Sequence, residues 1–415
     1  MQLGWIDFSR QDKTDAVNII NSLKEKGVLD ELGFGALRQA FANFFFPGTS
    51  TIQTRAKYFF IVPYILHDFI ASATANENDF QKFLADSQNK ISGKGEKEHH
   101  TGKLLVENMG KVEDDEAMGI IGSRSIKGGK WVERTPLSIY WNGLRTFGFF
   151  HSSNPNFTYA DFMMRIFMLT KNNSDSKTAV KRKKDESDDT DSGNFSKTSP
   201  LVKLGTYSKS WEKDISINLT KSEAQLLKTK ISENVPESLL SFILENKIDI
   251  SSCGNDFELF STLVSPKVDS ETAQKLSLAN KANEFYYLTM LRYSLLLCKN
   301  QVQEIADEWE RAWSNKTRIC NNFDAETTFA AMNVQNPRLK IFLLKLQKAF
   351  LEDDLKSCDE IISKRERELK GNRAKLNNPD YEFTEMDARI FMRFDYRLGN
   401  AATIIHDIYA GEERC

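Results

Sequence analysis

The chain has 415 residues, of which 40% are hydrophobic, and it includes 29 phenylalanines. This length and content predict two or three domains with packed cores. The formal net charge of -2 at pH 7 excludes a surface that is basic throughout, so any contact with nucleic acid must come from a local patch. Only nine prolines interrupt the chain, and long periodic segments fill its second half, which favours a mainly helical protein.

The cysteines and the N-terminal segment indicate in which cellular compartment the protein is expected. Five cysteines are scattered along the sequence without a C-x-x-C pair, which predicts reduced thiols rather than a disulfide framework or a zinc site. The opening MQLGWIDFSRQDK contains acids and no apolar h-region, so we expect no secretory signal. No apolar run approaches the length of a membrane span. A cytoplasmic protein that does not enter the membrane is therefore expected.

The first elements in chain order are helices over residues 12–23 and 35–46, followed by a break at Pro47-Gly48. The hydroxyls of residues 49–51 then predict the start of a third helix, with free backbone N–H groups in its first turn. This helix-turn-helix-like stretch is one candidate for binding DNA phosphates, through Thr49, Ser50, Thr51, Arg55 and Lys57. The alternative is a turn that joins two core helices, with Arg55 bound to a carboxylate.

Residues 76–92 are amphipathic and predict a further helix, and the next candidate site follows it. Over residues 133–150, ERTPLSIYWNGLRTFGFF, Thr135 and Pro136 predict a helix start and Gly148 predicts its end. A short capped helix that leads into an apolar strand is typical of a winged helix-turn-helix. The residues before it, GSRSIKGGKW, are basic and glycine-rich, and together the two stretches supply the second candidate set: Arg124, Lys127, Lys130, Arg134, Ser138 and Arg145. The alternative is a capped core helix beside a solvated basic loop.

Residues 171–199 contain almost no apolar side chains, and a basic block meets an acidic block there. Such a composition predicts a flexible loop or linker. Beyond it, Thr220 and Glu223 match a capping box at the start of a helix. The rest of the chain predicts successive helices at 237–246, 271–279, 281–314, 337–370 and 400–410.

Motifs for known chemistry are missing from the sequence. It has no phosphate-binding G-x-x-x-x-G-K-[ST] loop, no G-x-S-x-G and no H-E-x-x-H. Among its five histidines, His67 precedes an aspartate, but the further ligands of a metal phosphohydrolase do not follow, so a helix-face histidine satisfied by a neighbour is expected. We therefore assign no catalytic residues, metal ligands or cofactor.

Several phrases together resemble a bacterial family that is known only as a domain of unknown function. They are LGWIDFS at residue 3, LGFGALRQAFANFFFPGTSTIQTRAKYFFIVPYI at 32, GIIG at 119, RTPLSIYWNGLRTFG at 134 and YRLGNAATIIHDI at 396. The resemblance supplies no catalytic residues. It implies a genomic context, in which such proteins are often encoded in phage-defence islands beside helicases and phospholipase-D-like nucleases.

The predicted fold class is mainly α, with an N-terminal helical domain (1–170) that contains winged helix-turn-helix-like elements, a charged linker (171–200) and a C-terminal α-helical domain (201–415). The predicted function is a non-enzymatic DNA-binding or adaptor subunit of an antiphage defence system. Its expected partners are double-stranded DNA and a helicase or phospholipase-D-like nuclease. Two alternatives remain open, a metal-dependent nuclease with an unrecognised site and a scaffold that binds only proteins.

Overall fold

The structure is a computed structural model, and it describes residues 30–72, 104–105, 119–123, 134–152, 154, 156–180, 199–213, 215–384 and 392–414. The side chains of residues 69, 72 and 170–180 are not among those described. The helices predicted over 12–23 and 76–92 lie outside the described residues, and so do Arg124, Lys127 and Lys130.

The prediction of a mainly helical protein is confirmed. The described residues form fourteen α-helices and no β-strand, and their one β-bridge is antiparallel and joins Phe150 to Leu201. Within the described part of the chain, no helix combines the length and the apolarity that crossing a bilayer requires.

The chain divides into two compact units that alternate along the sequence. Unit 1 comprises residues up to Phe46 together with Ile248–Gly399, and unit 2 comprises Pro47–Lys247 together with the residues from Asn400 onward. Whether residues 171–200 separate two domains stays a prediction, because most of them lie outside the described residues.

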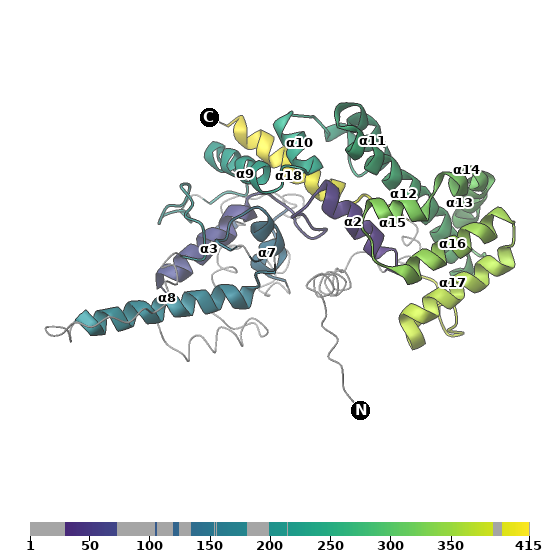
Figure 1. The fold of residues 1–415 in the computed structure, drawn as a ribbon, viewed down its shortest axis with the longest axis horizontal. Helices are drawn as coiled ribbons and strands as arrows, with labels where there is room; N and C mark the ends of the chain where they lie inside the picture. Colours follow the sequence, from purple (N-terminus) through teal and green to yellow (C-terminus); the bar gives the residue numbers. More distant parts are fainter. Residues whose placement is uncertain are drawn as a thin grey trace. The chain divides into compact units, whose positions relative to one another are not determined.

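Unit 1 is a bundle built around its longest helix, α12 (Figure 1). The second half of α12 is buried on nearly every side. A hydrophobic helix of this kind forms the centre of a helical core. The tyrosine hydroxyl of Tyr293 on α12 donates to the buried Glu366 carboxylate at 2.7 Å. The α-helices of unit 1 are α2 (Gly35–Phe45), α11 (Phe257–Val264), α12 (Ser270–Leu297), α13 (Gln303–Ser314), α14 (Lys316–Asn322), α15 (Ala325–Ala331), α16 (Pro337–Leu351) and α17 (Leu355–Lys370).

Two long helices predicted for this unit are wrong in their bounds. The segment predicted as one helix over 281–314 breaks after Leu297, where Lys299 and Asn300 adopt left-handed φ values of 51° and 59°. The segment predicted over 337–370 breaks at Asp353, with φ 56°, and Asp354 then caps α17. Neither break contains a glycine or a proline, so periodicity alone does not reveal them.

Unit 2 contains α3 (Tyr58–Ser72), α7 (Pro136–Thr146), α8 (Tyr159–Val180), α9 (Lys221–Asn234), α10 (Leu239–Glu245) and most of α18 (Leu398–Glu412). In this unit α3 packs against α7, and α9 packs against α10 (Figure 1). The capping box predicted for α9 is confirmed, since Thr220 and Glu223 exchange both of its hydrogen bonds.

Over its first ten residues, the segment 171–200 continues α8 as far as Val180, while its role as a linker stays a prediction. The segment 171–180 has no glycine or proline, so nothing in it stops a helix that is already formed, and each further residue adds one backbone hydrogen bond. The remainder, 181–198, lies outside the described residues.

Candidate nucleic-acid interface

The turn before α3 differs from its prediction. The helix was expected to begin at residues 49–51, but α3 begins at Tyr58. Pro47 and Gly48 (φ +78°) reverse the chain, and the side chain of Gln53 donates to the Gly48 carbonyl at 3.1 Å while it accepts from the Ser50 amide at 3.2 Å. The predicted hydroxyl caps are therefore wrong, because residues 49–57 form a turn that is stabilised from within.

Arg55 is bound to a carboxylate inside unit 2. Its Nε donates to both oxygens of Asp407 at 3.0 and 2.9 Å, and its Nη2 lies 2.8 Å from Asp407 Oδ1. The same carboxylate accepts from the Ala56 amide at 2.8 Å, and Asn218 accepts a further bond from Nη2 at 3.1 Å. A forked guanidinium–carboxylate pair of this kind fixes both geometry and charge. This is the arrangement that the alternative interpretation of the turn predicted.

Lys57 is bound in the same manner and is more deeply buried. Its ammonium lies 2.6 and 2.8 Å from the two oxygens of Glu223, and the two side chains are 9% and 4% exposed. Glu223 also accepts from Tyr64 at 3.1 Å and from the Thr220 amide at 2.9 Å. One carboxylate therefore caps α9, neutralises Lys57 and binds α3.

The three hydroxyl residues of the turn make no outward-facing set. Thr49 is 1% exposed, and Ser50 Oγ is buried without a hydrogen-bond partner among the described residues. Thr51 is half-buried. The structure therefore brings together the five residues predicted in this stretch, but it directs the two charged ones to internal carboxylates.

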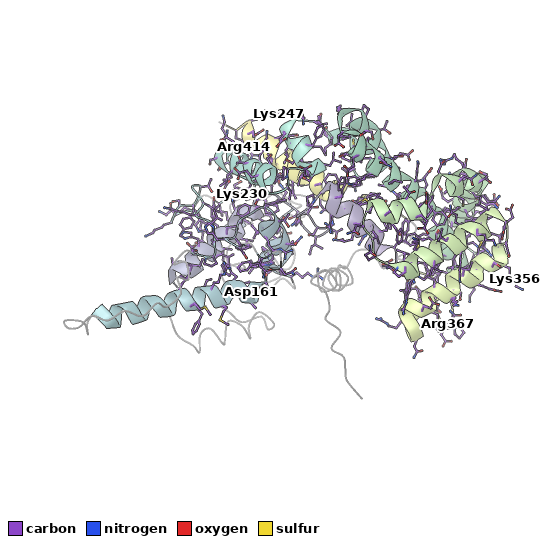
Figure 2. The ribbon with its side chains drawn as sticks, viewed as in Figure 1. Asp161, Lys230, Lys247, Lys356, Arg367 and Arg414 are labelled. Atoms are coloured by element: carbon purple, nitrogen blue, oxygen red, sulfur yellow. The ribbon has the colours of Figure 1, made fainter. Side chains whose placement is uncertain are left out.

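The capped helix predicted between Thr135 and Gly148 is confirmed as α7. Thr135 is its N-cap and accepts from the Ser138 amide at 3.4 Å, Pro136 is its first residue, and Gly148 follows it with φ +69°. Lys230 of α9 (Figure 2) donates to the Gly148 carbonyl at 2.9 Å, where a cation complements the C-terminal end of a helix dipole. Burial lowers the pKa of Lys230.

The inner side of α7 is fixed by Tyr140 and Gly143. The Tyr140 hydroxyl accepts from the amides of Thr54 and Arg55 at 2.9 and 3.1 Å and donates to the Arg55 carbonyl at 2.8 Å, and burial raises the pKa of Tyr140. A Cβ at Gly143 would lie 2.5 Å from the Gly48 carbonyl oxygen. Only glycine allows this approach, so the turn and α7 form a rigid pair.

The opposite side of α7 bears Ser138, Asn142 and Arg145, which we call the outer face of α7. At about 100° per residue, these three positions fall within about 60° of one another. Ser138 and Asn142 are exposed, and Arg145 is half-buried. The Arg145 guanidinium donates to Asn142 Oδ1 at 2.7 Å, and among the described residues no carboxylate pairs with it. Burial lowers the pKa of Arg145, because it removes water from around the charged guanidinium.

The sequence prediction included Ser138 and Arg145 but missed Asn142. The signal that identifies it is the i, i+4, i+7 spacing of the three polar residues, opposite the apolar face. Arg134 is half-buried next to the N-cap. The strand predicted after the helix is not formed in the described residues, where Phe150 makes an isolated antiparallel bridge to Leu201.

The His67-Asp68 pair of α3 packs against the aromatic side chains of Tyr207 and Trp211. Asp68 accepts from the Tyr207 hydroxyl and, at 3.0 Å, from Trp211 Nε1, while burial and the Asp68 carboxylate raise the pKa of Tyr207 to about 12. The His67 ring stacks on Tyr207 with centroids 4.0 Å apart, and its Nδ1 has no hydrogen-bond partner among the described residues. Within that part of the chain, no three His, Cys, Asp or Glu side chains gather as metal ligands.

The match to known proteins covers the region of this site. Residues 1–163 match the model of a family of unknown function, DUF6361. The DUF6361 match includes the Thr49–Lys57 turn and all of α7, and it ends within α8. No curated protein and no solved structure matches the chain.

Proposed function

We propose that this chain is a DNA-binding adaptor subunit that contacts duplex DNA through the outer face of α7. The observation that supports this proposal is Arg145, a partly desolvated guanidinium whose described hydrogen-bond partner is the neutral Asn142. Arginine and asparagine are the side chains that pair with guanine and adenine edges in the major groove, and a serine hydroxyl suits a base edge or a phosphate. The rigid support by Tyr140 and Gly143 supplies the fixed geometry that such recognition requires.

The proposal retains the basic residues that precede α7, Arg124, Lys127, Lys130 and Arg134, as further phosphate contacts. It no longer assigns phosphates to Arg55 and Lys57, because their charges are neutralised by Asp407 and Glu223. In the antiphage-defence setting that the family resemblance implies, a helicase or phospholipase-D-like nuclease would perform the chemistry in the cytoplasm. The adaptor would hold that partner on DNA.

The test is binding of the full chain to a labelled duplex of about 30 base pairs across a salt series. The wild-type protein is expected to show a log–log slope of several units, because each neutralised phosphate contributes about 0.9. Arg145→Gln and Asn142→Ala are each expected to weaken binding by about tenfold, or about 1.4 kcal/mol, which lies within the range of about 1–3 kcal/mol per lost base contact.

Lys247→Gln is the matched control, because Lys247 belongs to the same unit and is 70% exposed (Figure 2). Its ammonium lies 3.9 Å from the Glu412 carboxylate, which is a long separation for an ion pair. A protein that binds DNA equally well with and without Arg145 would overturn the assignment of α7. A weak, salt-insensitive response of the wild type would favour a protein scaffold, and chelator-sensitive cleavage of the duplex would favour a nuclease.

A further inference from the structure

The outward side of α16 in unit 1 is apolar where a solvent-exposed helix is ordinarily polar. Ile341, Leu344 and Leu351 are 53%, 38% and 41% exposed. They make up three of the eight large hydrophobic side chains that are exposed among the described residues. Single exposed leucines are common on protein surfaces, but three on the same side of one helix, with Lys348 between Leu344 and Leu351, form an apolar strip of the kind that marks an interaction site.

The spacing of these residues matches a coiled-coil seam. Positions 341, 344, 348 and 351 follow the a, d, a, d pattern of heptads, with Lys348 at the second a position. The three apolar residues fall within about 80° of the helix circumference, which is narrower than the apolar face of a helix that lies in a membrane surface or a core. The strip therefore fits one partner helix better than a bilayer.

The remainder of α16 packs into the bundle and holds the helix in place. Its opposite side is buried in the bundle through Leu339, Phe342, Leu343, Leu346, Ala349 and Phe350. Asn336 caps its N-terminus by accepting from the Leu339 amide at 3.0 Å. The helix therefore keeps its place without a partner, and the strip is a preformed surface.

The charges beside the strip determine the chemistry of the partner. Arg338 and Lys345 are exposed along one border, and Lys348 lies within the strip, where its carboxylate neighbour Glu352 is 3.7 Å away and itself 58% exposed. Lys340, on the other border, is already bound to Glu326 of α15. A lysine at an a position is unfavourable unless the opposite helix presents an acidic group to it.

A second copy of this chain fits poorly, because a two-fold axis would place the same basic strip on both sides of the interface. We infer that the exposed strip of α16, formed by Ile341, Leu344, Lys348 and Leu351, binds an acidic amphipathic helix of a partner protein as a two-helix coiled coil. This inference extends the adaptor part of the proposed function. It depends on α16 alone, so its failure would leave the DNA assignment of α7 in place.

The probe is a fluorescein-labelled peptide of about 21 residues, three heptads, with leucine along the seam and glutamate on both flanks. Binding to the full-length protein is followed by fluorescence anisotropy. The glutamate peptide is expected to bind at least about tenfold more tightly than a peptide with the same seam and lysine flanks. Ile341→Asp and Leu344→Asp are each expected to reduce its affinity at least about tenfold, and Lys345→Glu with Lys348→Glu is expected to reverse the preference between the two peptides.

Leu259→Asp is the matched control, because Leu259 is 47% exposed on α11 of the same unit and lies outside the strip. It should bind the glutamate peptide as the wild type does. Equal binding of both peptides, or binding that survives Ile341→Asp, would overturn the inference. So would concentration-dependent self-association or binding to phosphatidylserine vesicles that Ile341→Asp removes, because a second copy or a membrane would then be the occupant.

Discussion

In the Thr49–Lys57 turn, both cations form ion pairs with buried carboxylates: Arg55 with Asp407, and Lys57 with Glu223. On the outer face of α7, Arg145 reaches only a neutral amide among the described residues. The two regions touch each other through Tyr140, which accepts from the backbone of the turn. One region therefore uses its charges to stabilise the fold, and the other holds a guanidinium that no carboxylate of the described residues neutralises.

The difference shows that a cation count does not identify a nucleic-acid surface. Arg55 and Lys57 are followed by a hydrophobic helix, and burying that helix also takes the two charges out of water. A buried charge requires an internal partner, whereas a half-exposed one on a helix surface does not. The position of a residue relative to the core decides which role its charge takes.

Lys57→Met gives the largest effect that tests this comparison. It leaves Glu223 buried and unpaired, so the free energy of unfolding is expected to fall by about 3–5 kcal/mol. The double variant with Glu223→Gln should recover part of this loss, because it removes the uncompensated charge. Urea unfolding of the full chain, followed by circular dichroism, measures both changes.

Arg311→Met is the control for that measurement, because the Arg311–Glu308 pair is 69% and 36% exposed and such pairs contribute about 0–1 kcal/mol. If Lys57→Met costs no more than this control, the turn is not stabilised by its buried ion pair. Lys57 would then return to the set of candidate phosphate ligands.

Local signals predicted α7 well, and long-range contacts explain what was missed. Thr135, Pro136 and Gly148 fixed the bounds of α7 because capping depends on neighbouring residues. The partners of the turn are remote, since Glu223 is 166 positions from Lys57 and Asp407 is 352 positions from Arg55. No periodicity or spacing in one sequence connects residues so far apart, so the turn was interpreted as an exposed site.

Gly143→Ala separates the packing of α7 from its surface chemistry. The new Cβ would lie 2.5 Å from the Gly48 carbonyl oxygen and 2.7 Å from the Phe59 ring, so the turn and α7 must move apart. The expected loss is about 1–3 kcal/mol in thermal or urea unfolding. Gly205→Ala is the control, because nothing lies within 4 Å of its Cβ position. Equal stability of the two variants would mean that the turn and α7 are not tightly packed.

Thr135→Ala removes the N-cap of α7 and is expected to cost about 0.5–1 kcal/mol, in the lower part of the range for caps because the bond to the Ser138 amide is 3.4 Å long. Thr135→Ser retains the hydroxyl and should restore the stability of the wild type. A loss that serine does not restore would show that the methyl group, and not the cap, stabilises this end of the helix.

Arg145→Gln gives the smallest change in stability and the sharpest contrast with Arg55. Burial already lowers the pKa of Arg145, and no described carboxylate pairs with it, so removing the charge leaves no buried anion behind. The free energy of unfolding is expected to change by no more than about 0.5 kcal/mol, whereas Arg55→Gln leaves Asp407, which is 4% exposed, without its guanidinium. The same Arg145→Gln protein should bind the duplex about tenfold more weakly. If it instead loses as much stability as Arg55→Gln, its guanidinium has an internal partner, and the two regions use their charges in the same way.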